Sequence, residues 1–127
     1  MAAENEIDEV ILFPSAARVA TVNGADQSNR FAKGIIFTVD MTAVTATGSI
    51  VFTLQGKDPV SGKWYTILAS AAVTGVATTT YTVFPGAPAT ANVSANFQLP
   101  KTWRLIATAA NGVSMTYSVG GTLLFES

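Results

Sequence analysis

The strongest pattern in the sequence is an alternation of apolar and polar residues between positions 34 and 58. Apolar residues occupy every second position in two runs: Ile35, Phe37, Val39 and Met41, then Ile50, Phe52 and Leu54. Successive side chains of a strand point to opposite faces of its sheet, so a period of two predicts two strands with one apolar face each. Two strands cannot bury these faces alone, and we expect further strands or a second sheet to cover them.

Similar alternation predicts strands along the rest of the chain. The segments concerned are 63–69, 79–84, 97–99, 102–109, 113–119 and 122–125. In 63–69, Trp64, Thr66 and Leu68 are expected to share one face. No segment has the period of an amphipathic helix. We therefore expect an all-β chain, an antiparallel β-sandwich or jelly-roll-like barrel of seven to eight strands with Phe52 and Trp103 in its core.

Turn residues separate these strands. The segment 58–62 (DPVSG) predicts a hairpin turn, because proline presets φ and glycine can adopt positive φ. Asn111-Gly112 predicts a second hairpin, of type I′, between the last two long strands. The connection 85–96 is long for a hairpin, and we expect it to cross from one sheet to the other. Gly120-Gly121 allows a bend or a bulge.

The first 33 residues differ in character from residues 34–127, which we take as the β-sandwich domain. Acidic residues gather at the start of this N-terminal segment, and the apolar run Val10, Ile11, Leu12 and Phe13 follows and ends at Pro14. Proline disfavours helix at the residue before it, so the run predicts a strand or an extended arm. Two alternatives remain: the first edge strand of the sandwich, or an N-terminal arm that pairs with a neighbouring molecule.

Composition limits the kinds of partner. At 127 residues the chain fits one domain, only 12% of its residues are charged, and its net charge is −1. Such a surface is poor for binding nucleic acid, which requires a basic patch. No apolar run approaches the roughly 20 residues of a membrane-spanning helix, and the start lacks the features of a signal peptide, so we expect no membrane association and synthesis in the cytoplasm of a host cell.

Candidate chemistry is sparse. The chain has no cysteine and no histidine, which removes the usual nucleophile–base pairs and the commonest metal ligands. Nothing in the sequence singles out two of the carboxylates beyond the acidic start as catalytic partners, and that start lacks the spacing of a calcium loop. No glycine pattern for phosphate binding is present. We expect no enzymatic activity, no cofactor and no metal site.

Two non-catalytic classes remain. One is a component of an assembly that docks on other protein subunits. The other is a carbohydrate-binding β-sandwich in which Trp64 and Tyr65 form a stacking platform for sugar rings. Most aromatic residues follow the apolar alternation, which favours packing in the core.

The sequence also resembles a family of small β-rich structural proteins of tailed bacteriophages. The segments that carry the resemblance are QGKDPVSGKWYTIL, VFPG, LPKTWR and SMTYSVGGTLL, within residues 31–124. The resemblance implies a structural protein of the virion. It favours a capsid decoration, or cement, protein, and the alternative is a minor tail or head–tail joining protein.

As a decoration protein, the chain is expected on the outer capsid surface, bound to the major capsid protein and strengthening the shell. A homo-oligomer, such as a trimer at threefold positions, is the expected form. The candidate interface residues are Val10, Ile11, Leu12, Phe13, Arg18, Trp64 and Tyr65. If residues 1–14 are an arm that adds a strand to a neighbour, their deletion should abolish capsid binding and leave the sandwich folded.

Overall fold

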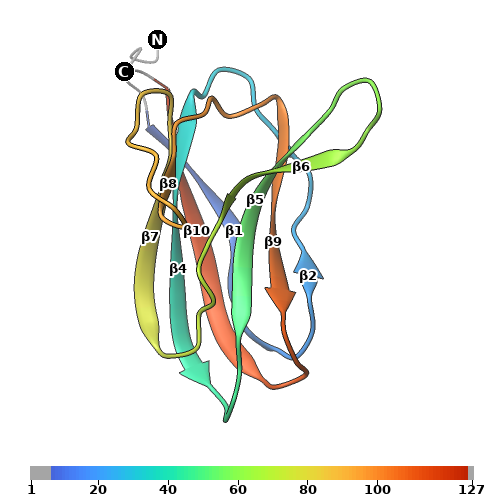
Figure 1. The fold of residues 1–127 in the computed structure, drawn as a ribbon, viewed down its shortest axis with the longest axis vertical. Coiled ribbons are helices and arrows are strands. Elements are labelled where there is room, and N and C mark those ends of the chain that lie inside the picture. The colour runs from blue at the N-terminus through green and yellow to red at the C-terminus, as the bar shows by residue number, and fades with distance from the viewer. Residues whose placement is uncertain (1–6, 126–127) are drawn as a thin grey trace.

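The computed structural model describes residues 7–125, which form two β-sheets packed face to face (Figure 1). The first sheet contains, in spatial order, β1 (Ile7–Arg18), β10 (Met115–Leu124), β4 (Gly34–Val44), β7 (Ala77–Val83) and β8 (Ser94–Ala95). The second contains β2 (Val22–Asn23), β9 (Thr102–Ala109), β5 (Ile50–Lys57) and β6 (Trp64–Ala69), and β3 (Gln27–Ser28) also pairs with β9. All these pairs are antiparallel except β7–β8.

The predicted all-β sandwich is confirmed. Seven of the strands have six residues or more, the other three have two, and the two sheets do not close into a barrel. Between residues 7 and 125 there is no helix.

The core lies between the sheets, where the predicted apolar faces meet. The buried residues from the four central strands are Ile35, Phe37, Val39 and Met41 of β4, Ile50, Phe52 and Leu54 of β5, Trp103, Leu105 and Ala107 of β9, and Met115, Tyr117 and Val119 of β10. Phe52 and Trp103 are 0% and 2% exposed, so both predicted core aromatics are confirmed.

Most long strands are joined by connections that cross between the sheets, and this corrects two predictions. Asn111-Gly112 does not form a hairpin, because β9 pairs with β5 in the second sheet while β10 pairs with β4 in the first. Neither of its residues has the positive φ that a type I′ turn needs. The connection 85–96 does not cross, because β8 returns beside β7 in the first sheet. The crossing follows at 96–101, where the predicted strand 97–99 is irregular.

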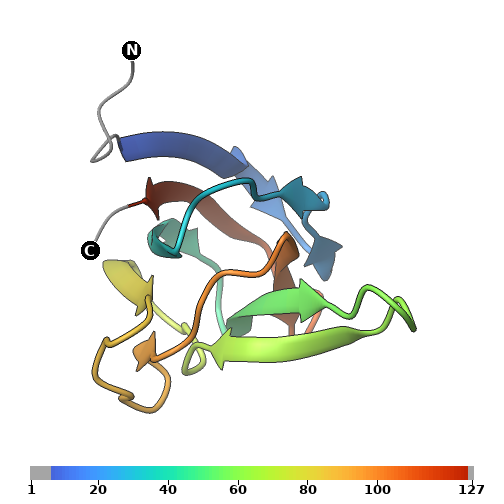
Figure 2. The ribbon, with the colours of Figure 1, turned by 90° about the horizontal axis from the view of Figure 1, so that it is seen from above.

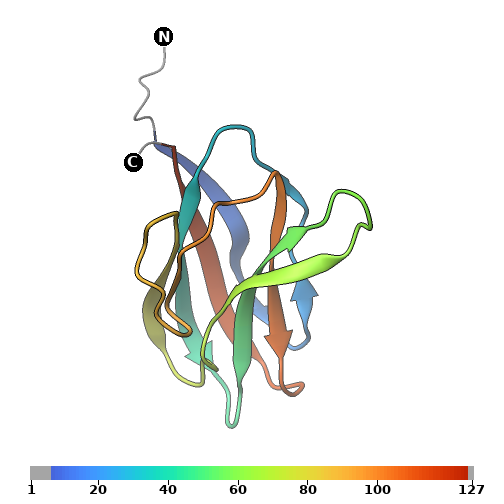
Figure 3. The same ribbon diagram turned by 45° about the horizontal axis from the view of Figure 1, so that its top comes forward.

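The hairpin at 58–62 is confirmed. The Asp58 amide donates to the Lys63 carbonyl at 2.8 Å, and Gly62 has φ +74°. The two strands that it joins, β5 and β6, extend beyond the body of the sandwich, so the turn projects into solvent (Figures 1 and 3).

The predicted alternation in β6 is wrong, because a bulge interrupts this strand. Leu68 pairs with Leu54, but the next pair is Thr66 with Gln55, so Ile67 is an extra residue. Side chains before the bulge are therefore displaced to the other face. Leu68 is buried, whereas Trp64 lies on the outer face of the second sheet.

The N-terminal segment is joined to the sandwich along its described length. β1 pairs with β10 from Ile7 to Arg18, and β2 and β3 pair with β9. β1 shifts register against β10 twice, between Ile11 and Phe13 and between Phe13 and Ala16. β10 continues without a break through Gly120-Gly121 to Leu124. Of the two alternatives, residues 7–18 form the edge strand. The acidic residues Glu4 and Glu6 lie outside the described residues.

Candidate docking surface

The side chains of the apolar run in β1 lie partly against the core, while β1 itself is an edge strand of the first sheet. Phe13 is 4% exposed, and its ring meets that of Tyr117 edge-on with centroids 6.1 Å apart. Val10 and Leu12 are half-buried against the core, and Ile11 is the exposed member of the run, at 76%. Phe13 is therefore corrected from an interface residue to a core residue, because its side chain is buried in the sandwich. An interface role for Val10, Ile11 and Leu12 stays a prediction.

Arg18 holds the irregular end of β1. Its guanidinium donates to the carbonyl oxygen of Tyr117 at 2.9 Å, to that of Ala16 at 3.2 Å and to that of Pro14. It also lies 4.5 Å from the centroid of the Tyr117 ring. Burial raises the pKa of the Tyr117 hydroxyl above its usual 10.0, and the positive charge of Arg18 opposes this shift. Three internal acceptors thus occupy Arg18, which acts as a clamp on β1.

Trp64 and Tyr65 do not form one platform, because consecutive residues of a strand point to opposite faces. On the outer face of the second sheet, the Arg104 guanidinium lies 4.1 Å and the Lys57 ammonium 5.4 Å from the centroid of the Trp64 ring. Arg104 also donates to the Gln55 side-chain oxygen at 2.9 Å. Cations therefore lie against the Trp64 ring, where a sugar would have to stack.

Tyr65 belongs instead to a second aromatic pair. Its ring lies over Gly56, where an added Cβ would come within 2.6 Å of the Tyr65 ring and 2.8 Å of the Pro100 side chain. Only glycine leaves room for this arrangement. The Tyr65 and Phe97 rings meet at 65° with centroids 6.2 Å apart, and the residues are 39% and 42% exposed.

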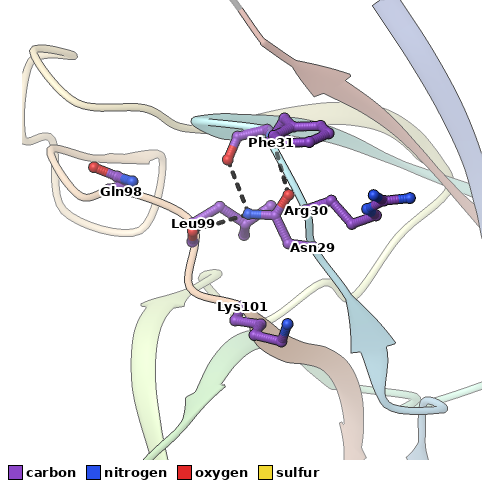
Figure 4. A pocket seen from close by; sticks show the side chains of 7 residues that line it. Asn29, Arg30, Phe31, Gln98, Leu99 and Lys101 are labelled. Carbon is purple, nitrogen blue, oxygen red and sulfur yellow. Dashed lines mark hydrogen bonds between the residues drawn. The ribbon is translucent and has the colours of Figure 1, made fainter.

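A hollow beside this pair carries a further exposed aromatic residue (Figure 4). The Asn29 amide donates to the carbonyl oxygens of Ala32 at 2.8 Å and Leu99 at 3.0 Å, and its oxygen accepts from the Ala32 amide at 2.8 Å. These bonds hold segment 29–33 against segment 98–101. Phe31 is carried on this turn and is 73% exposed, with the Arg30 guanidinium 5.3 Å from its ring centroid.

A second hollow lies on the other side of Lys101, which lines both. Its walls are the hairpin turn 57–62, Tyr65 and the segment 100–102, and its volume is ≈ 660 Å³. Val60, at the hairpin tip, is 94% exposed. In the same turn, the Ser61 hydroxyl and the amides of Val60 and Ser61 donate to the Asp58 carboxylate and lower its pKa.

We call this region the aromatic corner. It consists of the apolar residues Phe31, Val60, Tyr65 and Phe97 and the cations Arg30, Lys57, Lys63 and Lys101. Viewed from above, the segments 29–33 and 96–101 lie beside each other at one end of the sandwich, and the β5–β6 hairpin projects outward from that end (Figure 2).

Charge is distributed unevenly around this corner. Six of the seven lysines and arginines fall in the segments 23–34, 56–66 and 96–104 that build it, together with two carboxylates, Asp26 and Asp58. The segments thus carry a net charge of +4, although the whole chain carries −1. Asp8 and Glu9 begin β1 at the same end of the sandwich but at its opposite edge (Figure 2).

Sequence reasoning identified Tyr65 in this corner but missed Phe31 and Phe97. Phe31 follows Arg30 in a mostly polar, irregular stretch, where an isolated aromatic residue was the available signal. Phe97 lies between Asn96 and Gln98 in a segment that was expected to be a short strand.

Residues 7–125 contain neither a candidate metal site nor a helix able to span a membrane. No three carboxylates gather closely enough there to hold a metal ion. Comparison of the chain with protein-family models, with curated protein sequences and with solved structures found no match.

Proposed function

We propose that this protein is a structural, non-enzymatic component of a bacteriophage virion that decorates the outer capsid surface and stabilises the shell. The observation that carries the proposal is the aromatic corner, where three exposed aromatic rings and four cations gather on one end of a small sandwich. Exposed apolar groups that cluster beside charged ones are typical of surfaces that bind other proteins. The sequence resemblance supplies the kind of assembly.

The stabilising mechanism is mass action. A protein that binds the assembled shell, and not its separated subunits, shifts the equilibrium toward the shell. At a free concentration of about 100 times Kd, each bound copy adds about 2.7 kcal/mol. Many copies on symmetric positions, as monomers or as a closed oligomer such as a trimer, would therefore strengthen a shell without any covalent bond.

The test compares particles of the parent phage made with and without this gene. We expect particles that lack the protein to release their DNA at a lower temperature, and purified protein added back to restore the higher temperature. Equal release temperatures in both preparations would contradict decoration. A shell of unchanged stability with the protein retained at the tail would instead support the tail or joining role.

A further inference from the structure

We propose that the aromatic corner is the docking site and that its partner is a carboxylate-rich patch on the shell protein. Phe31, Tyr65 and Phe97 supply the apolar contact. Arg30, Lys63 and Lys101 pair with carboxylates around it. This inference rests on the proposed function and adds to it the docking face and the chemistry of the partner.

The aromatic residues are held in place before a partner binds. Tyr65 is packed on Gly56 and Pro100, and its ring meets Phe97 edge-on. The turn that carries Phe31 is tied to segment 98–101 by the Asn29 side chain and by a 2.9 Å bond from the Leu99 amide to the Lys33 carbonyl. Because little motion is lost on binding, such groups contribute strongly to affinity.

The charges of the corner indicate an acidic partner. Within residues 7–125 the one ion pair joins Lys57 to Asp26, with nitrogen and oxygen 3.8 Å apart. Arg30, Lys63 and Lys101 form no ion pair with the described residues. The second carboxylate, Asp58, accepts bonds from its own turn. Three cations are therefore left to a partner, which electrostatic complementarity requires to be negative.

A protein fits this corner better than a nucleic acid does. Two of the six cations in the segments that build the corner, Lys57 and Arg104, lie against the Trp64 ring and are only partly available to a phosphate backbone. The Tyr65 and Phe97 rings are inclined at 65°, whereas successive bases stack on parallel rings.

The experiment measures binding of labelled protein to particles that lack it, by co-sedimentation. Phe31→Ala tests the apolar contact, and we expect about 30-fold weaker binding, as for a central interface aromatic. Its matched control is Val76→Ala, because Val76 is 68% exposed beside β7 at the other end of the sandwich and should leave binding unchanged. Since Phe31 is 73% exposed, both variants should melt like the parent protein.

The charge test uses the double variant Lys63→Gln/Lys101→Gln. We expect binding to weaken about 3- to 30-fold and to lose part of its salt dependence between about 0.05 M and 0.3 M NaCl. Thr80→Glu/Thr108→Glu is the control, because it changes the net charge by the same amount at exposed positions outside the corner. Equal effects of the two double variants would show a response to net charge alone and overturn the proposal.

The remaining outcomes separate this inference from the proposed function. If the Phe31 and lysine variants bind particles as well as the parent protein does, the aromatic corner is not the docking site, and the decoration role is unaffected. Parent protein that does not bind particles would overturn both. Equally tight binding to a 20-nucleotide single strand would indicate that the partner is a nucleic acid. Salt-sensitive self-association that is lost in the lysine variant would indicate that the partner is a second copy of this chain. Either result would overturn the acidic shell patch as the partner.

Discussion

Truncation should destabilise the protein much more at Phe13 than at Ile11, two apolar residues of β1. Phe13 is 4% exposed and contacts Tyr117, with the Arg18 guanidinium 5.4 Å from its ring centroid. Phe→Ala changes in protein cores cost about 3–5 kcal/mol, from lost burial and the cavity left behind. Because β1 is an edge strand and can relax, we expect about 3 kcal/mol, or a Tm lower by about 10 °C for a chain of this length. Ile11→Ala, at a position 76% exposed, should cost less than about 0.5 kcal/mol.

The assay is urea unfolding followed by the fluorescence of the two tryptophans, with calorimetry for the change in Tm. Both variants should keep the slope of the parent transition, since neither alters the surface exposed on unfolding by much. Free energies of unfolding for Phe13→Ala and Ile11→Ala that agree within about 0.5 kcal/mol would refute the placement of β1 in the core. The N-terminal segment would then be an arm after all.

Three further predictions follow from the same contacts. Deletion of residues 1–14 should unfold the domain, because it removes the pairing of β1 with β10 and uncovers the core; a folded truncated protein by circular dichroism would contradict this. Arg18→Met should lower the free energy of unfolding by about 1–3 kcal/mol in urea, because it removes charge-assisted bonds to three carbonyl oxygens, and an unchanged value would exclude the clamp. The pKa of Asp58 in a carbon-detected NMR titration should lie below 3.8 and rise in Ser61→Ala, because the bonds from its turn favour the carboxylate. Any stability from these bonds is present above pH 3.8 and lost as the pH falls through the folded-state pKa; a pKa equal in both proteins would count against the bonds.

The sequence predicted the strands well because each alternating run records which face is buried. Phe37, Phe52 and Trp103 lie in the core for this local reason, and no knowledge of the partner strand was needed. The turn at 58–62 was also predictable, because Gly62 meets a local demand for positive φ.

Pairing was less predictable because it depends on residues far apart in the chain. Asn111-Gly112 is a strong local hairpin signal, but β9 and β10 gain more by pairing with β5 and β4 in different sheets. The extra residue Ile67 in β6, which moves Trp64 to the outer face, has no signature in the alternation.

The aromatic corner could not be predicted for the same reason. Its three parts, 29–33, 57–65 and 97–101, are separated by tens of residues, and only the crossings between sheets bring them together. The sequence offered Trp64 beside Tyr65 as a platform, whereas the fold separates these two and pairs Tyr65 with Phe97.

The most direct test of the proposed decoration role is the copy number of this protein in purified particles of the phage proposed as its source, measured by quantitative mass spectrometry against the major capsid protein. Decoration of the shell predicts hundreds of copies in a fixed ratio to the capsid subunits. A few copies, in multiples of three or six, would place the protein at the tail or the head–tail joint. Its absence from the particles would contradict a role in the virion.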